Sequence, residues 1–205
     1  MMEEWFENSV EAQALRQHLQ TYFGPLEKTL IQKTCTDLEV PVEVMVLGAT
    51  EKRPYKVLST LGLSHYKMHV PEHLAGYGLE YAELVMAIPA DWPIEEGDWP
   101  VQWLTEAAQL ASRRQAWLGW GYVAELETPE DNGFSGIMLM LPDEFAPKAA
   151  ECRVGERKDV HFYQVVPLYP EELALAQAES MGALMERFDS DFSPVVDMKR
   201  KNYAK

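Results

Sequence analysis

Three histidines lie four residues apart, at His65, His69 and His73, a spacing that would align three imidazoles along one face of an α-helix. Such a row could hold a metal ion, because imidazole nitrogens are common zinc ligands. Pro71 falls inside the span, however, and a proline disfavours helical geometry at the residue before it. No carboxylate or cysteine ligand stands at a matching offset. The pattern therefore favours a loop with polar or capping histidines over a metal site.

Two glycine-containing segments imitate sites for catalysis or nucleotide binding. Residues 62–66 begin like the nucleophile elbow of a hydrolase but end in tyrosine, whereas the sharp turn of that motif requires glycine. Residues 119–124 imitate a dinucleotide-binding fingerprint, yet they run into a predicted strand where the motif must open a helix. We interpret the first segment as a turn that ends a strand, and the second as a tight chain passage that packs Trp117 and Trp120.

The adjacent acids Glu171 and Glu172 could form a pair of catalytic carboxylates only if they faced the same way. Neighbouring helical residues point about 100° apart, so the two cannot cooperate on one helical face. They suit instead the first turn of a helix, where the positive end of the helix dipole favours acids. We therefore predict no catalytic residue, no cofactor and no metal.

Three helices are predicted to position these residues. The first opens at Asn8, with Glu11 three residues on as a capping box. The second covers residues 99–111, where apolar side chains recur at helical spacing. The third begins at Pro170, because proline is tolerated at the first position of a helix.

Strands are predicted from alternating or β-branched apolar residues, at 40–47, 55–61, 81–88, 119–126, 136–141 and 160–168. They arrive in runs separated by a helix and do not alternate singly with helices. This order predicts an α+β fold, in which a mixed or antiparallel sheet packs with about three helices. We find no internal repeat and no linker. A single domain is expected over residues 1–205, with its core at about 9–188 and an irregular tail at 189–205.

The composition is that of a globular protein, with 47% hydrophobic and 11% aromatic residues in a chain of 205. Its two cysteines, Cys35 and Cys152, lie far apart, which excludes zinc knuckles and CxxC redox motifs. The N-terminus is acidic and no apolar run approaches the roughly 20 residues of a membrane helix, so neither a secretory signal nor a membrane span is predicted. We expect a soluble, cytoplasmic protein.

Charge is the strongest compositional signal, because 18 basic and 33 acidic side chains give a net charge of −15. Such a field repels nucleic acid and anionic membranes, and it speeds encounter with basic proteins. Plain solubility in an acid-rich proteome would explain the same excess. We expect a protein partner, with no direct contact to nucleic acid or membrane, and the oligomeric state is left open.

Tryptophan side chains are candidates both for the core and for a contact surface. Trp92 lies on a proline-flanked loop among the acids Glu95, Glu96 and Asp98, so either environment fits it. Trp103 lies on the apolar stripe of a predicted helix, which favours the core.

Taken together, the chain resembles the Suppressor of fused domain family in its bacterial single-domain form. The likeness spans about residue 22 to residue 172 and depends on many short segments in one order. The residues that carry it, which we expect to be mainly structural, are Pro54, Tyr55, Thr60, Gly62, Ser64, Met68, Pro71, Glu83, Leu84, Pro89, Asp91, Trp103, Trp117, Gly119, Gly121, Pro167, Leu168, Tyr169 and Glu172.

This resemblance implies a domain without known catalysis that acts by binding proteins. The animal member that gives the family its name has a second, C-terminal domain, and it holds an extended peptide of transcription factors by strand addition. Bacterial members look like immunity proteins of polymorphic toxin systems, each neutralising a cognate toxin, often a nuclease. Many relatives have histidine where this chain has Tyr122, which weakens any role for an imidazole at that position.

Three functions are therefore considered. The first is an immunity or antitoxin protein that neutralises a cognate toxin by binding it. The alternative is a peptide-binding adaptor or regulator that sequesters a partner by strand addition. The third, an uncharacterised hydrolase, would need a pocket with a perturbed acid or base. The candidate partner-binding residues are Trp92, Glu95, Glu96, Asp98, Trp120 and Tyr122.

Overall fold

A computed structural model describes residues 6, 9–31, 40–126, 132–156 and 158–205. The helices in these residues are α2 (Val10–Tyr22), α3 (Trp99–Arg113), α4 (Pro170–Ala178) and α5 (Met181–Met185). The strands are β1 (Leu26–Ile31), β2 (Glu43–Leu47), β3 (Tyr55–Leu61), β4 (Tyr81–Pro89), β5 (Val123–Glu125), β6 (Gly136–Met140), β7 (Glu151–Val154) and β8 (Lys158–Leu168). Short 3-10 turns lie at η1 (Leu63–His65), η2 (Glu72–Leu74) and η3 (Pro147–Ala150).

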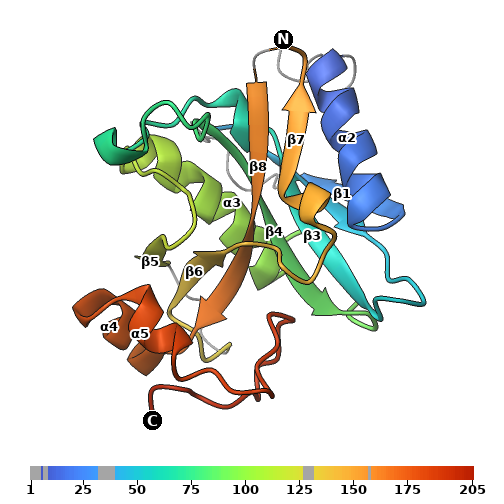
Figure 1. The fold of residues 1–205 in the computed structure, drawn as a ribbon. Helices are drawn as coiled ribbons and strands as arrows, with labels where there is room; N and C mark the ends of the chain where they lie inside the picture. The colour runs from blue at the N-terminus through green and yellow to red at the C-terminus, as the bar shows by residue number, and fades with distance from the viewer. Residues whose placement is uncertain (1–5, 7–8, 32–39, 127–131, 157) are drawn as a thin grey trace.

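One mixed sheet contains these strands, in the order β1-β2-β3-β4-β8-β6-β5 (Figure 1). β4 and β8 run parallel, from the pair Tyr81–Val160 to the pair Val85–Gln164, and the other neighbouring strands are antiparallel. β7 lies off this path, because it pairs with the beginning of β8 whereas β6 pairs with its end. The arrangement confirms the predicted α+β fold with a mixed sheet in a single domain.

Side chains of the sheet are buried on both faces. In β2, Val44 and Val46 belong to the core on the α3 side, while Met45 and Leu47 belong to the core on the α2 side. α4 and α5 cover the α2 side at the other end of the sheet, over β6 and β8 (Figure 1). Burial of this apolar area stabilises the fold by about 25 cal/mol per Å².

α3 is an amphipathic helix whose apolar side packs on β2, β3 and β4. Asp98 is its N-cap, and Pro100 occupies the first turn, where a missing N–H has no partner to lose. Trp103 is fully buried, with its ring centre 5.0 Å from that of Trp99. The predicted helix at 99–111 is confirmed and extends to Arg113.

The first predicted helix needs a correction at its start. Its N-cap is Ser9, whose Oγ accepts a hydrogen bond from the N–H of Ala12 at 2.9 Å. Because the residue three positions after this cap is an alanine, the predicted capping box from Asn8 to Glu11 is wrong. Asn8 itself lies outside the described residues.

Strand predictions were incomplete where segments are short or charged. β1 was not predicted, because its two charged residues interrupt the alternating apolar pattern. β7 was not predicted, because four residues are too few to show such a pattern. The predicted strand at 40–47 begins at Glu43 within the described residues. The predicted strand at 119–126 is shortened to β5, because Gly121 turns the chain with φ 89° before Val123.

The last predicted helix divides into α4 and α5, because Ser180 caps a new helix by accepting from the N–H of Ala183 at 3.1 Å. The tail, expected to be irregular from residue 189, has no helix or strand among residues 186–205. It is nevertheless packed, since Val196 and Tyr203 are buried in two different core clusters. The packed region therefore extends beyond the expected boundary at residue 188.

Among the described residues, no helix is long and apolar enough to cross a membrane. Cys152 is a free, buried thiol, and Cys35 lies outside the described residues.

Candidate protein-binding surfaces

Glu83 is the centre of the first polar network formed by the resemblance residues. Its side chain on β4 is fully buried and accepts hydrogen bonds from Thr60 Oγ1 at 2.6 Å and Ser64 Oγ at 2.7 Å. The backbone N–H groups of Gly62 and Ser64 donate to the same carboxylate at 3.0 and 3.1 Å. Thr60 Oγ1 also accepts from the N–H of Leu84 at 2.8 Å, so the end of β3 is tied to β4. All of these donors are neutral, and they lie buried in the core together with the Glu83 carboxylate.

The conformation around this network depends on Gly62. Its φ is 121°, a region that L side chains rarely adopt, and a Cβ there would lie 2.5 Å from the carbonyl oxygen of Pro41. Burial raises the pKa of the Glu83 carboxyl, and the hydrogen bonds from Thr60, Ser64 and Gly62 oppose that shift. The Ser64 hydroxyl is thus fully buried and donates a hydrogen bond to a carboxylate, so it is not an exposed nucleophile.

A second polar network surrounds Glu172, which is also fully buried. Its Oε2 accepts from the N–H of Tyr169 at 2.9 Å, which caps the start of α4. Both carboxylate oxygens accept from the guanidinium of Arg200, each at 2.6 Å. The N–H of Tyr203 adds a bond of 2.9 Å to Oε1. Glu172 therefore joins α4 to the C-terminal tail, whereas its neighbour Glu171 is exposed and pairs with Lys205 at 2.9 Å.

Trp117 and its neighbours form a fixed corner after α3. Trp117 Nε1 donates to the carbonyl of Leu79 at 3.0 Å, and its ring covers Gly119 so closely that a Cβ on Gly119 would overlap it. Met68 Sδ accepts from the N–H of Leu118 at 3.3 Å. The predicted tight passage is therefore correct for Trp117, while Trp120 lies outside it.

The remaining resemblance residues occupy core positions, strand ends, turns and exposed positions. Tyr55 donates to Glu144 Oε2 at 3.0 Å, and burial raises the pKa of its phenol. Leu84 and Leu168 are core residues, Pro89 ends β4, Pro167 lies in β8, Pro71 precedes η2, and Pro54 and Asp91 are exposed.

The predicted acidic loop lies between β4 and α3. Glu95 is exposed and pairs with Lys28 of β1 at 2.8 Å, and Glu96 is exposed as well. Asp98 accepts from the N–H of Glu95 at 2.8 Å, which fixes the turn. Trp92 is half-buried against Trp99, with ring centres 6.0 Å apart in an edge-to-face arrangement. Trp92 is thus part core and part surface.

Trp120 and Tyr122 follow the other end of α3. Trp120 is 53% exposed, which is unusual for so large an apolar ring. Tyr122 is half-buried and interacts with Arg114, the C-cap of α3, while burial raises the pKa of its phenol.

The six candidate residues do not form one patch. The N-cap Asp98 and the C-cap Arg114 are separated by the 15 residues of α3. At 1.5 Å per residue, the two ends of this helix are about 22 Å apart. The acidic loop at one end and the Trp120–Tyr122 corner at the other are therefore two separate surfaces.

The histidines of the opening pattern are dispersed between two turns. His65 ends η1, and His73 lies in η2 beyond the extended residue Pro71. In the described parts of the chain, no group of three or more His, Cys, Asp or Glu side chains could hold a metal ion.

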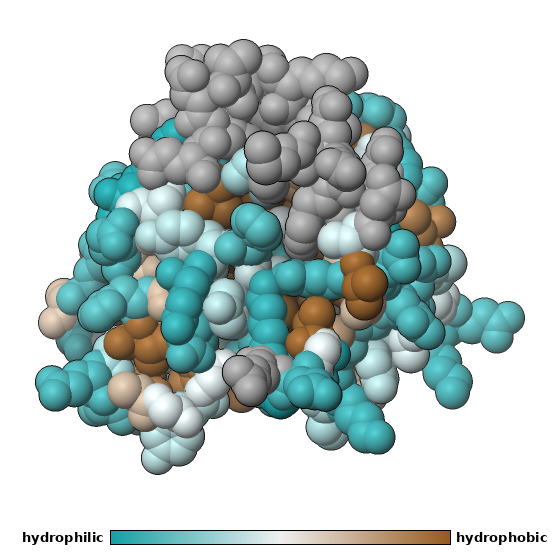
Figure 2. Space-filling model, turned by 90° about the horizontal axis from the view of Figure 1, so that it is seen from above, coloured by the Kyte–Doolittle hydropathy of each residue, from teal (hydrophilic) through white to brown (hydrophobic). Residues whose placement is uncertain are grey.

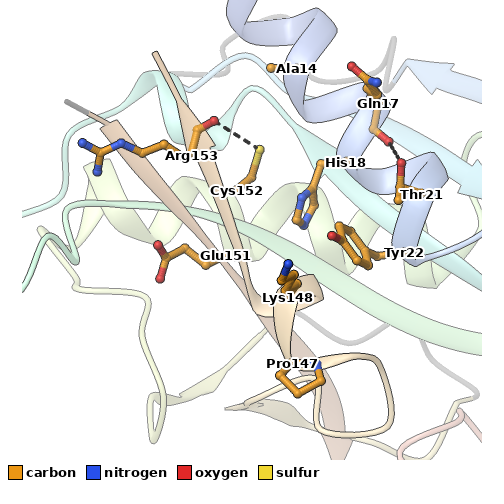
Figure 3. Close-up of a pocket in the computed structure, with 10 residues that line it drawn as sticks. All are labelled: Ala14, Gln17, His18, Thr21, Tyr22, Pro147, Lys148, Glu151, Cys152 and Arg153. Atoms are coloured by element: carbon orange, nitrogen blue, oxygen red, sulfur yellow. Dashed lines mark hydrogen bonds between the residues drawn. The ribbon is translucent and has the colours of Figure 1, made fainter. Parts of the chain in front are cut away.

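An open groove of about 650 Å³ lies between α2 and the segment formed by η3 and β7 (Figure 3). His18 of α2 points into it, with Nε2 3.0 Å from the carbonyl oxygen of Ala149 and its ring stacked on Phe162 at 4.9 Å. Cys152 points toward the same groove from β7. Neither residue is recognisable from the sequence as part of a site, because they are 134 positions apart and β7 was not predicted.

The groove contains a histidine and a thiol, but burial makes both less reactive. Desolvation lowers the pKa of the His18 imidazole below its usual 6.5, which favours the neutral ring. Burial raises the pKa of the Cys152 thiol to about 11, so the thiol keeps its proton at neutral pH. A neutral imidazole and a protonated thiol suit a groove that packs against another surface better than a reactive centre.

Seen from above, the surface is mostly hydrophilic, with small and separated hydrophobic areas (Figure 2). Charged and polar side chains thus dominate that face, in agreement with the high net charge. Among the described residues on that face, no single large apolar patch is visible.

Comparison with known proteins by sequence identifies relatives of this chain. The sequence model described as Suppressor of fused protein (SUFU) matches residues 39–201. An uncharacterized protein of Ureaplasma parvum is 27% identical over 172 residues, covering 82% of this chain and 83% of its own length.

Solved structures show the same fold at low sequence identity. The crystal structure of a SUFU homolog from Neisseria gonorrhoeae superposes with a TM-score of 0.68 at 15% identity, covering 94% of this chain and 96% of the other. A chain of the Sufu–Fu complex gives 0.63 at 15% identity and covers 93% and 89%. Drosophila Suppressor of Fused gives 0.62 at 14% identity, and the match spans 93% of this chain but 50% of that protein. Because the sequence model covers most of its residues, the chain belongs to the Suppressor of fused family.

Proposed function

We propose that this chain is a non-catalytic protein-binding domain that acts in the cytoplasm as an immunity protein, neutralising a cognate toxin by binding it. The observation that most strongly supports a binding role without catalysis is the burial of the polar resemblance residues. Thr60, Ser64, Glu83 and Glu172 are fully buried and are engaged in hydrogen bonds that hold the fold together. The exposed surface offers acids and aromatic rings instead.

The charge of the chain indicates the chemistry of the partner. A net charge of −15 accelerates encounter with a basic protein, such as a nuclease, by long-range attraction. Glu95 and Glu96 carry this charge on the exposed loop before α3. Rim charges of this kind affect mainly the association rate, and salt screens them beyond about 10 Å.

The Trp120–Tyr122 corner offers an aromatic anchor at the other end of α3. Large rings that become fully desolvated contribute much of the binding energy at protein interfaces. Trp120 is 53% exposed and directly follows the backbone corner formed by Trp117 and Gly119, so a partner that covers the ring would have to order little backbone.

The test is binding to, and protection from, a basic toxin encoded beside this chain's gene. Glu95→Gln with Glu96→Gln should slow association at low salt and have little effect at 1 M salt. Trp120→Ala should accelerate dissociation at every salt concentration. Glu179→Gln, a change in an exposed acid at the C-cap of α4, is the charge control for the acidic loop. A complex whose rates are unchanged in both variants would contradict the assigned surfaces, and turnover of a small molecule by the purified chain would contradict a non-catalytic role.

A second candidate function is a peptide-binding adaptor that extends the sheet. β7 supports it, because in the described residues β7 has one strand partner, β8, and borders the open groove beside α2 (Figure 3). A peptide could add to such an edge through backbone hydrogen bonds. Slower amide exchange at Glu151–Val154 in the complex would favour this mode, whereas protection confined to the Trp120–Tyr122 corner would oppose it.

A further inference from the structure

The C-terminal tail contacts the rest of the chain as an extended ligand would. The N–H of Val196 donates to the carbonyl oxygen of Ala87 in β4 at 2.9 Å, and the Val196 side chain is buried in the core beside α3. Tyr203 is buried in the cluster beneath α4 and α5. Between these two anchors the tail has no helix or strand. Its conformation therefore depends on contacts to other elements.

This tail fills the place where two strands of the sheet part. The parallel pairing of β4 with β8 runs only to the pair Val85–Gln164, and β8 then continues beside β6. Past that point, Val196 bonds to β4, while Arg200 Nη2 donates to the carbonyl oxygen of Pro167 in β8 at 2.8 Å. The tail thus links both strands where they no longer bond to each other.

Arg200 occupies a recess whose chemistry is specific for a guanidinium. Its two terminal nitrogens contact the two oxygens of Glu172, and one of them also reaches Pro167. The guanidinium lies 4.8 Å from the ring centre of Tyr169 and 5.6 Å from that of Phe134. A forked, planar cation satisfies these directions together, whereas a lysine ammonium cannot bond in the same bidentate way.

We propose that this recess is a binding site for an arginine-bearing extended segment of a partner protein, and that Arg200 fills it in cis until the partner's arginine replaces it. The proposal depends on the proposed function, in that the chain works by binding protein. Glu172 is fully buried, so a replacement for Arg200 must itself carry a positive charge.

Exchange requires little unfolding, because residues 186–205, which carry the occupant, contain no strand or helix that must be unthreaded. The tail also gives the pattern that a replacement should match. A β-branched residue, Val196, precedes the arginine by four positions, and an aromatic residue, Tyr203, follows it by three. Met198 between them is 50% exposed, so that position should accept other side chains.

The test uses the full chain and a fluorescent peptide with the sequence of residues 191–205. Arg200→Ala in the full chain empties the recess, so this variant should bind the peptide at least tenfold more tightly than the wild-type chain does. The same peptide carrying Arg200→Ala should bind the variant at least tenfold more weakly. Adding Glu172→Gln to the variant should abolish binding, while adding Glu179→Gln, a change in an exposed acid at the C-cap of α4, should not.

Circular dichroism of each variant shows first that it is folded. If the Arg200→Ala chain is not folded, Arg200→Lys takes its place, because it keeps the charge but cannot make the bidentate contact. A folded variant that binds neither peptide, or binds both equally, would overturn the proposal. That result would leave toxin binding untouched, since the toxin test uses Trp120 and the acidic loop and not this recess.

Discussion

Among the described residues, two carboxylates, Glu83 and Glu172, are fully buried, and only the second has a cation among its donors. Glu83 accepts from hydroxyls and backbone N–H groups of β3 and the turn after it, all neutral donors within the core. Glu172 accepts from Arg200, a cation in the irregular last residues of the chain. The first network is formed by sheet strands and the turn after them, whereas the second includes a segment without helix or strand.

This difference separates a network within the sheet from a contact that we propose is exchangeable. A carboxylate surrounded by neutral donors resists disturbance, because every donor would be left buried without a partner. The charge of Glu172 is balanced by one side chain, Arg200, and the segment that carries Arg200 has no helix or strand of its own. The predictions below separate these two situations.

Glu83→Ala should have the largest effect. It removes the acceptor for the N–H groups of Gly62 and Ser64, which cannot turn to another partner, and for two hydroxyls. Each unsatisfied buried donor costs about 1–3 kcal/mol, so we expect a loss of about 4 kcal/mol in the free energy of unfolding. Urea denaturation measures it. A loss below about 1 kcal/mol would mean that the network contributes little.

Arg200→Ala should cost less, about 2 kcal/mol, although removing one partner of a buried ion pair can cost about 3–5 kcal/mol. The smaller loss is expected because the tail can detach and let water reach Glu172. A cycle with Glu172→Gln and the double variant isolates the interaction energy in the same denaturation assay. A loss equal to that of Glu83→Ala would mean that the two networks are equally closed.

The pH dependence of stability should distinguish Glu83 by its sign. Burial raises the pKa of its carboxyl in the folded state above the usual 4.5, so the folded state holds the proton more tightly than the unfolded state. Stability from this group is fully present below pH 4.5 and is lost as pH rises through the folded pKa. The advantage of the wild type over Glu83→Gln should therefore shrink with rising pH. An advantage that grows over this range would contradict the assigned direction.

Trp120→Ala should change stability least, by no more than about 0.5 kcal/mol, because the ring is 53% exposed. Thermal denaturation of this variant measures the effect, with Trp103→Ala in the buried part of α3 as the contrast. A large loss would show that Trp120 supports the fold and is not free to bind a partner.

Much of the fold was accessible from the sequence, because its periodic segments are long. Alternating valines indicated β2, and apolar residues at helical spacing indicated α3. β7 escaped prediction because four residues carry too little pattern, and with it the groove at His18 and Cys152 was missed.

The candidate site was less predictable, because its residues come together from positions that are far apart in the sequence. Glu83 and Glu172 were recognised as resemblance residues, but nothing local to Glu172 indicates that its cation lies 28 positions away, at Arg200. The acidic loop and Trp120 were both selected, yet only the length of α3 shows that they form separate surfaces.

Amide hydrogen exchange on the full chain tests most directly whether the second network opens on its own. The N–H of Gly62 donates to Glu83, and the N–H of Tyr203 donates to Glu172, at 3.0 and 2.9 Å. After correction for intrinsic rates, we expect the Tyr203 amide to exchange at least about 100-fold faster, through local release of the tail. Equal protection of the two amides would mean that tail and core open together, and it would contradict the account.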